Sequence, residues 1–254
     1  MRADRPGAVL FDLDDTLYDH TRASRQALAE TAAAYRDLAE LDAETLFREF
    51  TRHNDECWAL AGCGQMTREE LAVARFRRTV EGFGVGHVEA EDLAGSYRAR
   101  YRRQRVEVPG ARETVLHLLD RLPVGVVTNG FPELVEDKLE AVGLAGRLSP
   151  VVVADRIEVM KPRPECFLAA LRLLGLPPEH VLYVGDSLRV DVAGAAGVGM
   201  RTAWLDRSGA CDLIHETRPD LVLRALPELL DRLLEEEGGR SGLSSPASRS
   251  APMR

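Results

Sequence analysis

Residues 8–16 read AVLFDLDDT, an apolar run from Ala8 to Phe11 followed by aspartates at positions 12, 14 and 15. Three carboxylates where a buried strand enters a loop are costly unless a cation or hydrogen bonds receive them. Residues two apart in an extended segment point the same way, so Asp12 and Asp14 can face one ligand. The alternative is an ordinary turn in which one aspartate caps the next helix.

Five further short apolar runs follow this first one along the chain. Runs of this length between helical patterns are typical of buried parallel strands, and they predict an α/β fold with a Rossmann-like parallel sheet. The runs span residues 124–127, 151–154, 181–184, 202–205 and 221–223.

The residue pattern changes between the first and second apolar runs, where Ala, Leu, Arg and Glu recur with helical spacing. We therefore predict an all-helical insert over residues 20–105 and an α/β core made of residues 1–19 and 106–237. Pro109 and Gly110 read as the hinge back into the core. Residues 238–254 are rich in Gly, Ser, Pro and Arg, which predicts a disordered tail.

The composition excludes several functions. With 254 residues, a net charge of −8 and 29% charged residues, the chain is typical of a globular protein and not of a binder of nucleic acid polymers. No apolar run reaches the ~18–20 residues of a membrane helix. The four cysteines form no CxxC pair and no secretory signal is visible, so we expect a cytoplasmic location.

Three other segments carry polar groups at or just beyond the ends of predicted strands. Ligands bind outside the carboxyl ends of an open parallel sheet, so these segments should meet residues 12–15 at one rim. A hydroxyl, a lysine and two acidic clusters together form a phosphate and metal site. The segments are Val127-Thr128-Asn129-Gly130, Met160-Lys161-Pro162, and Val184-Gly185-Asp186-Ser187 with Asp191.

These four motifs resemble those of the haloacid dehalogenase superfamily of hydrolases over residues 7–235. DLDDT is similar to its first motif, Thr128 to its second, Lys161 to its third, and GDSLRVD to its fourth. The resemblance implies that Asp12 attacks phosphorus to form an aspartyl-phosphate. Asp14 would act as the general acid and base, which implies a carboxyl held near its working pKa.

The resemblance also implies a Mg²⁺ site that includes Asp12, Asp186 and the backbone carbonyl of Asp14, with Asp191 supporting it from further out. Thr128 and backbone amides near Asn129 would bind the phosphoryl group, and Lys161 would neutralise charge. For Asp15, Asn129 and Asp191, a role as helix cap or turn residue stays open.

Asp14 separates the expected activity from dehalogenation, because dehalogenases of this fold have no alkoxide to protonate and lack that aspartate. The resemblance therefore favours a phosphatase that acts on a small phosphorylated metabolite. A sugar phosphomutase of the same fold and a non-catalytic binding protein on this scaffold are the alternatives. We expect a monomer or a homodimer.

The helical insert resembles the C1 caps of the branch that contains nucleoside-monophosphate phosphatases and N-acylneuraminate-9-phosphatase. If so, Trp58 would offer an aromatic face to the substrate, and Arg75 or Asn54 a polar contact. The alternative is that Trp58 is the large apolar residue that any amphipathic helix buries.

Overall fold

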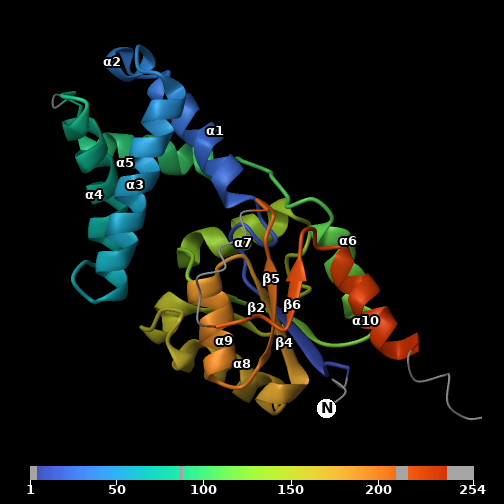
Figure 1. Ribbon diagram of the computed structural model, residues 1–254. Coiled ribbons are helices and arrows are strands. Elements are labelled where there is room, and N and C mark those ends of the chain that lie inside the picture. The colour runs from blue at the N-terminus through green and yellow to red at the C-terminus, as the bar shows by residue number, and fades with distance from the viewer. Residues whose placement is uncertain (1–4, 86–87, 210–216, 239–254) are drawn as a thin grey trace, which may run out of the picture.

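The computed structural model describes residues 5–85, 88–209 and 217–238. Its centre is a six-stranded parallel sheet in the order β3-β2-β1-β4-β5-β6 (Figure 1). The predicted α/β fold with a parallel sheet is confirmed. The strands are β1 (Ala8–Phe11), β2 (Val124–Thr128), β3 (Val151–Val153), β4 (Val181–Gly185), β5 (Arg201–Leu205) and β6 (Leu221–Leu223).

Strand β1 is buried on both faces, and its side chains alternate between two hydrophobic clusters. Ala8 and Leu10 pack with residues of α8 and α9, whereas Val9 and Phe11 pack with residues of α6 and α10. Fully burying a side chain such as Phe11 contributes about 1.5–3 kcal/mol, and a slip of one residue would exchange the faces. These helices are α6 (Ala111–Leu119), α8 (Pro164–Leu174), α9 (Ala193–Gly197) and α10 (Glu228–Gly238).

The sheet register brings the ends of the central strands to one rim. Phe11 pairs with Val126 on one side and with Val184 on the other, and the Asp12 amide donates to the Val184 carbonyl at 2.8 Å. The residues that follow β1, β2 and β4 therefore begin at the same edge. The remaining core elements are α7 (Pro132–Ala141), η1 (Ala154–Ile157), η2 (Pro178–His180) and η3 (Leu188–Val192).

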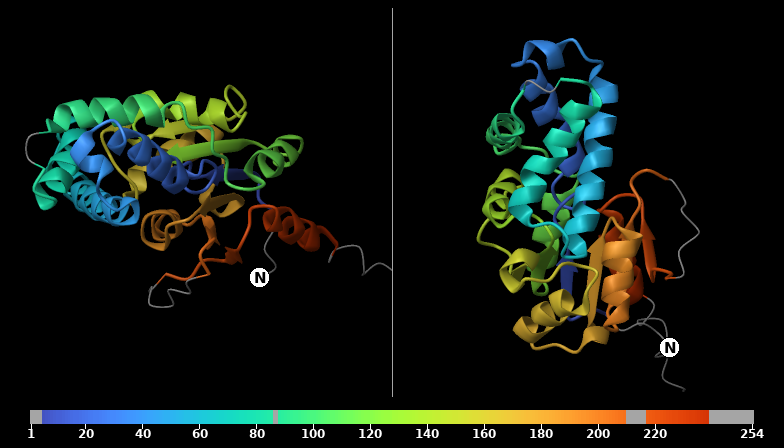
Figure 2. Two further views of the ribbon diagram at one scale, coloured as in Figure 1. Left: turned by 90° about the horizontal axis from the view of Figure 1, so that it is seen from above. Right: turned by 90° about the vertical axis from the view of Figure 1, so that its left-hand side faces the viewer.

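Helices α1 to α5 gather at one end of the molecule, away from the N-terminus (Figure 2). Among the described residues from 20 to 101, the chain forms helices and no strand. Aromatic rings of Phe50, Phe76 and Tyr97 join α3, α4 and α5, with centroids 5.0–5.6 Å apart. The helices are α1 (His20–Ala32), α2 (Arg36–Ala39), α3 (Ala43–Gly62), α4 (Arg68–Gly82) and α5 (Ala90–Tyr101).

The chain returns to the core through Gly110, which precedes α6 with a φ of 78°. A Cβ at this position would lie 2.6 Å from Pro227 Cγ, so the turn requires glycine for both conformation and space. The last described helix, α10, ends at Gly238, and the rest of the predicted disordered tail lies outside the described residues. No helix in the described ranges has the length and apolarity needed to cross a membrane.

Candidate active site

The predicted site residues surround one cavity of about 620 Å³ between the rim of the sheet and helices of the insert. A cavity of this size accommodates a small metabolite. The structure therefore brings together residues that are far apart in the sequence. Those that line the cavity are Asp12, Asp14, Trp58, Arg75, Thr128, Asn129, Lys161, Asp186 and Asp191.

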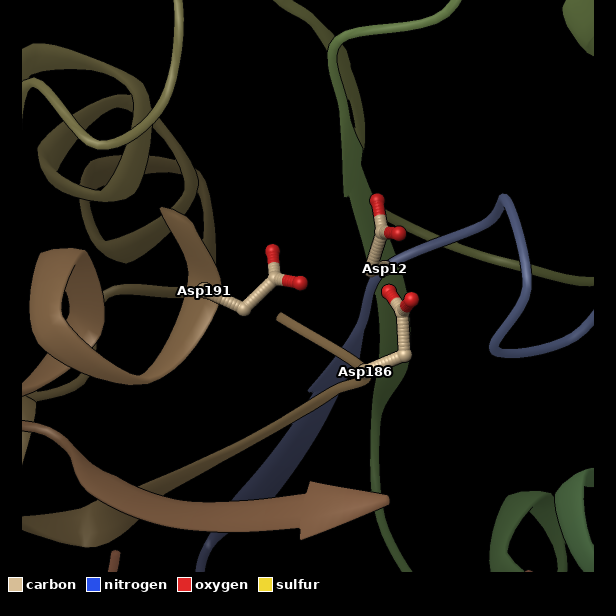
Figure 3. A group of neighbouring side chains, drawn as sticks. All are labelled: Asp12, Asp186 and Asp191. Carbon is tan, nitrogen blue, oxygen red and sulfur yellow. The ribbon is translucent and has the colours of Figure 1, made fainter. Parts of the chain in front are cut away.

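Three carboxylates converge at the rim, from Asp12 after β1, Asp186 after β4 and Asp191 on η3 (Figure 3). One oxygen from each lies within 4.8 Å of the others, as a metal site requires. The turn that supports them depends on Gly185, since a Cβ there would lie 2.5 Å from Asp191 Cγ. Glycine at this position lets the Asp191 side chain pack against the end of β4.

Lys161 is the buried counter-ion of this cluster. Its Nζ donates to Asp12 Oδ1 at 2.6 Å, to Asp191 Oδ1 at 2.7 Å and to the Tyr183 hydroxyl at 3.0 Å. Burial alone would lower the pKa of Lys161, but the two carboxylates raise it well above its usual value. The ammonium is therefore held charged beside Asp12.

Both carboxylate oxygens of Asp191 accept hydrogen bonds from the protein. Its Oδ1 accepts from Lys161, and its Oδ2 accepts from the Ser187 amide at 3.1 Å. In contrast, Asp12 Oδ2 and the Asp186 carboxylate accept no hydrogen bond from any described residue. Asp12 and Asp186 are thus the carboxylates that remain available to a ligand, and Asp191 positions Lys161 and the η3 turn.

The charges of this cluster fit a divalent cation. When all three carboxyls are ionised, their negative charge exceeds the positive charge of the Lys161 ammonium by two. Burial raises the pKa of Asp12 to about 7 and that of Asp186 well above its usual value. Carboxylate oxygens are preferred ligands of Mg²⁺, so Asp12 and Asp186 suit that ion.

Thr128 ends β2 with its side chain buried at the rim. Its Oγ1 accepts a hydrogen bond from the Gly130 amide at 3.0 Å, which leaves the hydroxyl hydrogen available for a bound anion. A Cβ on Gly130 would lie 3.2 Å from Thr128 Oγ1 and 3.3 Å from Asp14 Oδ2. The glycine therefore leaves space for the side chains of Thr128 and Asp14 beside it.

Asn129 is predicted to contribute to substrate binding, and the structure gives its side chain another function. Its Nδ2 donates to the Lys161 carbonyl at 3.0 Å, and its Oδ1 accepts from the Lys161 amide at 2.8 Å. Both polar atoms of the amide are thereby used to join β2 to the Lys161 loop. These bonds tie Asn129 to the Lys161 backbone, and the residue also lines the cavity, so its contact with substrate stays a prediction.

Asp14 pairs with a residue that the sequence does not reveal. Lys138 of α7 donates to Asp14 Oδ1 at 2.6 Å and to Oδ2 at 2.8 Å, and its side chain is buried. Burial raises the pKa of Asp14, but Lys138 and His20 outweigh it, so the pKa is lowered. The expectation of a pKa near the working range is wrong for this arrangement, because the ammonium stabilises the ionised carboxyl.

Replacing Lys138 by methionine is expected to raise the pKa of Asp14, since the opposing ammonium is removed while burial remains. If Asp14 must be protonated when it acts as an acid, the decline of kcat/KM at high pH will begin at a higher pH. Lys138→Arg keeps the charge and should leave this limb closer to its original position. If the high-pH decline of kcat/KM began at the same pH in Lys138→Met as in the wild type, Lys138 would not set the pKa of Asp14.

Asp15 has the structural function that the sequence leaves open. Its φ of 58° is in the left-handed region, and its carboxylate accepts from the amide and hydroxyl of Thr21 at 2.9 and 2.8 Å. Arg207 also pairs with it at 3.2 Å. These contacts fix the turn between β1 and α1.

Two further cavity residues, His20 and Tyr101, are absent from the predicted site. His20 Nδ1 lies 2.7 Å from the Tyr101 hydroxyl, and burial lowers the pKa of His20.

Tyr183, whose hydroxyl accepts a hydrogen bond from Lys161, could have been found from the sequence, because a tyrosine within the buried run VLYVG needs a partner for its hydroxyl. Lys138 and His20 resemble ordinary residues of amphipathic helices, so the sequence offers no comparable signal.

Trp58 lies where the insert meets the core. Its ring packs edge-on against Phe131, with centroids 5.6 Å apart, and the guanidinium of Arg68 lies 4.4 Å from the Trp58 ring. Arg68 also pairs with Asp155 of the core at 3.3 Å. Trp58 therefore lines the cavity and also joins the two parts of the chain, so substrate contact and packing are both compatible with its position.

A parallel α/β core thus gathers carboxylates, a lysine and a hydroxyl around one cavity. Residues 6–199 match the haloacid dehalogenase-like hydrolase family. The chain belongs to that family, and the predicted resemblance is confirmed.

Several curated relatives of the chain are named as phosphatases. Phosphoserine phosphatase of Thermus thermophilus is 31% identical, with 87% of this chain and 96% of the relative covered. Glyceraldehyde 3-phosphate phosphatase of Methanopyrus kandleri is 30% identical, with coverages of 90% and 97%. N-acylneuraminate-9-phosphatase of Rattus norvegicus is 26% identical, with coverages of 90% and 94%.

Solved structures with the same fold include the HAD-hydrolase YfnB of Bacillus subtilis bound to magnesium. It has a TM-score of 0.81 and 24% identity, with 91% of this chain and all of that chain covered. The L-2-haloacid dehalogenase of Xanthobacter autotrophicus has a TM-score of 0.70 and 24% identity, with coverages of 91% and 98%. Dehalogenases therefore share the fold of this chain.

Proposed function

We propose that the chain is a Mg²⁺-dependent phosphatase that hydrolyses a small phosphomonoester through an aspartyl-phosphate on Asp12. The observation that carries this proposal is the environment of Asp12. One of its oxygens is held by Lys161 at 2.6 Å, the other accepts no hydrogen bond from the described residues, and the residue lines the cavity. A fixed carboxylate with an available oxygen suits nucleophilic attack on phosphorus.

Asp14 supports ester hydrolysis rather than dehalogenation, because a leaving alkoxide needs a proton. In the observed arrangement Lys138 keeps Asp14 ionised. An incoming phosphoryl dianion would compete for the Lys138 ammonium, so its arrival would let Asp14 take up a proton. The same carboxyl, once it has donated that proton, can accept one from the attacking water.

The phosphoryl group would be bound by Lys161, the Thr128 hydroxyl and the backbone amides that follow Thr128. Asp12, Asp186 and the carbonyl of Asp14 would hold Mg²⁺, with Asp191 fixing their surroundings. When bound, the ion would supply the positive charge that lets an anionic ester approach an anionic carboxylate. We further propose that helices α1 to α5 act as a cap that excludes water from the cavity.

The test is release of inorganic phosphate from p-nitrophenyl phosphate and a panel of phosphomonoesters, with and without Mg²⁺. L-2-chloropropionate is assayed in parallel for halide release. Phosphate release that needs Mg²⁺ is expected, without halide release. Halide release without phosphate release would overturn the proposal, and transfer between sugar hydroxyls faster than hydrolysis would identify a mutase.

Stabilisation of the protein by Mg²⁺ is expected to increase with pH. In the ion-free protein the pKa of Asp12 is raised to about 7, above the ~3.9 of an unfolded chain. Its proton therefore favours the folded state fully below pH ~4, and that contribution is lost as pH rises through about 7. Mg²⁺ needs the ionised carboxylate, so protons compete with it.

Below pH about 7, the apparent Mg²⁺ affinity should fall by up to about tenfold per pH unit for each proton displaced. The measurement is the Tm difference between Mg²⁺ and EDTA at pH about 5.5 and about 7.5. Asp186→Asn should greatly reduce the increment at the higher pH. Equal increments at both pH values in the wild type would contradict a site built from Asp12 and Asp186.

A further inference from the structure

Arg75 of α4 is a buried cation at the end of the cavity formed by the insert. It is 9% exposed, and it lies among aromatic rings. Its Cζ is 5.5 Å from the ring centroid of Phe50, 5.2 Å from Phe76, 5.3 Å from Tyr97 and 5.9 Å from Phe131. Such contacts attract the guanidinium, but they supply no hydrogen-bond acceptor in its plane.

The hydrogen bonds of Arg75 are incomplete. Nη1 donates to Asn54 Oδ1 at 2.9 Å, whereas Nε is buried and has no partner among the described residues. No carboxylate of those residues lies within 4.0 Å of its guanidinium nitrogens. A buried charge without an opposite charge is costly, so the fold maintains an expensive arrangement at this position.

The two buried lysines that line this cavity differ from Arg75 in this respect. Lys161 is paired with Asp12 and Asp191, and Lys138 is paired with Asp14. Each is thus neutralised before any substrate binds. Arg75 is also buried, but no carboxylate of the described residues neutralises it, and it shares a cavity with the proposed nucleophile.

The volume of the cavity leaves room for more than a phosphoryl group. Its approximate 620 Å³ is about twenty times the ~30 Å³ that one water molecule occupies in the liquid. A substrate can therefore place its phosphate at the rim and extend a carbon skeleton toward α4. A packing role for Arg75 would account for the aromatic contacts, but not for the unpartnered Nε or for its position on the cavity wall.

We propose that Arg75, supported by Asn54, binds a carboxylate at the end of the substrate opposite its phosphate. A planar guanidinium matches a carboxylate with two parallel hydrogen bonds. One positive charge balances one carboxylate, whereas a second phosphate dianion would leave one negative charge unbalanced. This inference rests on the proposed phosphatase function, and it assigns the substrate to the phosphorylated carboxylic acids.

The test compares esters that differ only in a carboxylate at two chain lengths. The pairs are 3-phosphoglycerate with glycerol 3-phosphate, and 6-phosphogluconate with sorbitol 6-phosphate. In at least one pair, kcat/KM for the acid is expected to exceed that for the alcohol by about 10- to 100-fold. Fructose 1,6-bisphosphate and fructose 6-phosphate form a third pair that tests a second phosphate.

Arg75→Gln is expected to reduce the preference for the acid to less than about threefold, because the neutral amide cannot pair with a carboxylate. Arg78→Gln is the matched control, since Arg78 lies on the same helix, pairs with Glu56 and does not line the cavity. It should keep the preference. Circular dichroism and thermal melting establish whether each variant is folded. If Arg75→Gln does not fold, Asn54→Ala takes its place, and it should weaken the preference for the acid.

Absence of a preference in both acid pairs would overturn the inference, as would a preference that survives Arg75→Gln. A preference for the bisphosphate that depends on Arg75 would assign the site to phosphate instead and would also overturn it. If the wild type hydrolyses none of these esters, the proposed function fails separately. Calorimetric Kd values of Asp12→Asn for the same pairs then decide the inference, with tighter binding of the acid expected.

Discussion

Asp12→Asn is expected to lower Mg²⁺-dependent phosphate release by at least about 10³-fold. The amide cannot form an acyl phosphate, although it occupies almost the same volume as the carboxylate. Lys161 keeps its bond to Asp191 in this variant, so the fold should be retained. The measurement is kcat with p-nitrophenyl phosphate at saturating Mg²⁺.

Asp15→Asn is the matched control for Asp12→Asn. It makes the same chemical change three residues further on, where the carboxylate caps Thr21 and pairs with Arg207. Asparagine tolerates a left-handed backbone, so most of the activity should remain. Equal losses in the two variants would show that the region needs its charge or its fold rather than a nucleophile at position 12.

Lys161→Met is expected to lower kcat/KM by about 10²–10³-fold, because it removes a preorganised positive charge from both the nucleophile and the phosphoryl group. It also leaves Asp12 and Asp191 without their shared ammonium. Removal of one partner from a buried pair costs about 3–5 kcal/mol. Because the pKa of Asp12 is raised, its carboxyl can take up a proton and offset part of this cost. The loss of stability should therefore be smaller at low pH.

Kinetics and urea unfolding at two pH values measure both consequences of Lys161→Met. Arg163→Gln is the control, since Arg163 lies two residues further on and forms an exposed pair with Glu165. It should change neither activity nor stability by more than a small amount. A Lys161→Met enzyme with unchanged kcat/KM would show that the lysine has only a structural role.

The sheet could be predicted because each strand is a short apolar run, and because parallel strands end at one edge. The same rule predicts from the sequence alone that Asp12, Thr128 and Asp186 lie together. The ion pair between Asp14 and the buried Lys138 could not be predicted in this way. Lys138 belongs to a helix 124 residues further along, and only the packing of α7 brings its ammonium to the carboxyl.

The insert shows the same limit. Its helical character follows from spacing, but the position of its side chains over the rim depends on contacts such as that of Trp58 with Phe131. Arg75 has the sequence environment of an ordinary helix residue, and its burial without a counter-ion among the described residues is visible only in three dimensions. The division into core and cap, the monomer or homodimer, and the individual site roles stay predictions.

The most direct test of Asp12 as nucleophile is chemical trapping of the acyl phosphate. The enzyme is mixed with substrate and Mg²⁺, quenched in acid and treated with borohydride, which reduces an aspartyl-phosphate to homoserine. Peptide mass spectrometry should then find homoserine at position 12 only when substrate was present. Phosphate release without any reduction at position 12, or with reduction at another aspartate, would contradict the proposed mechanism.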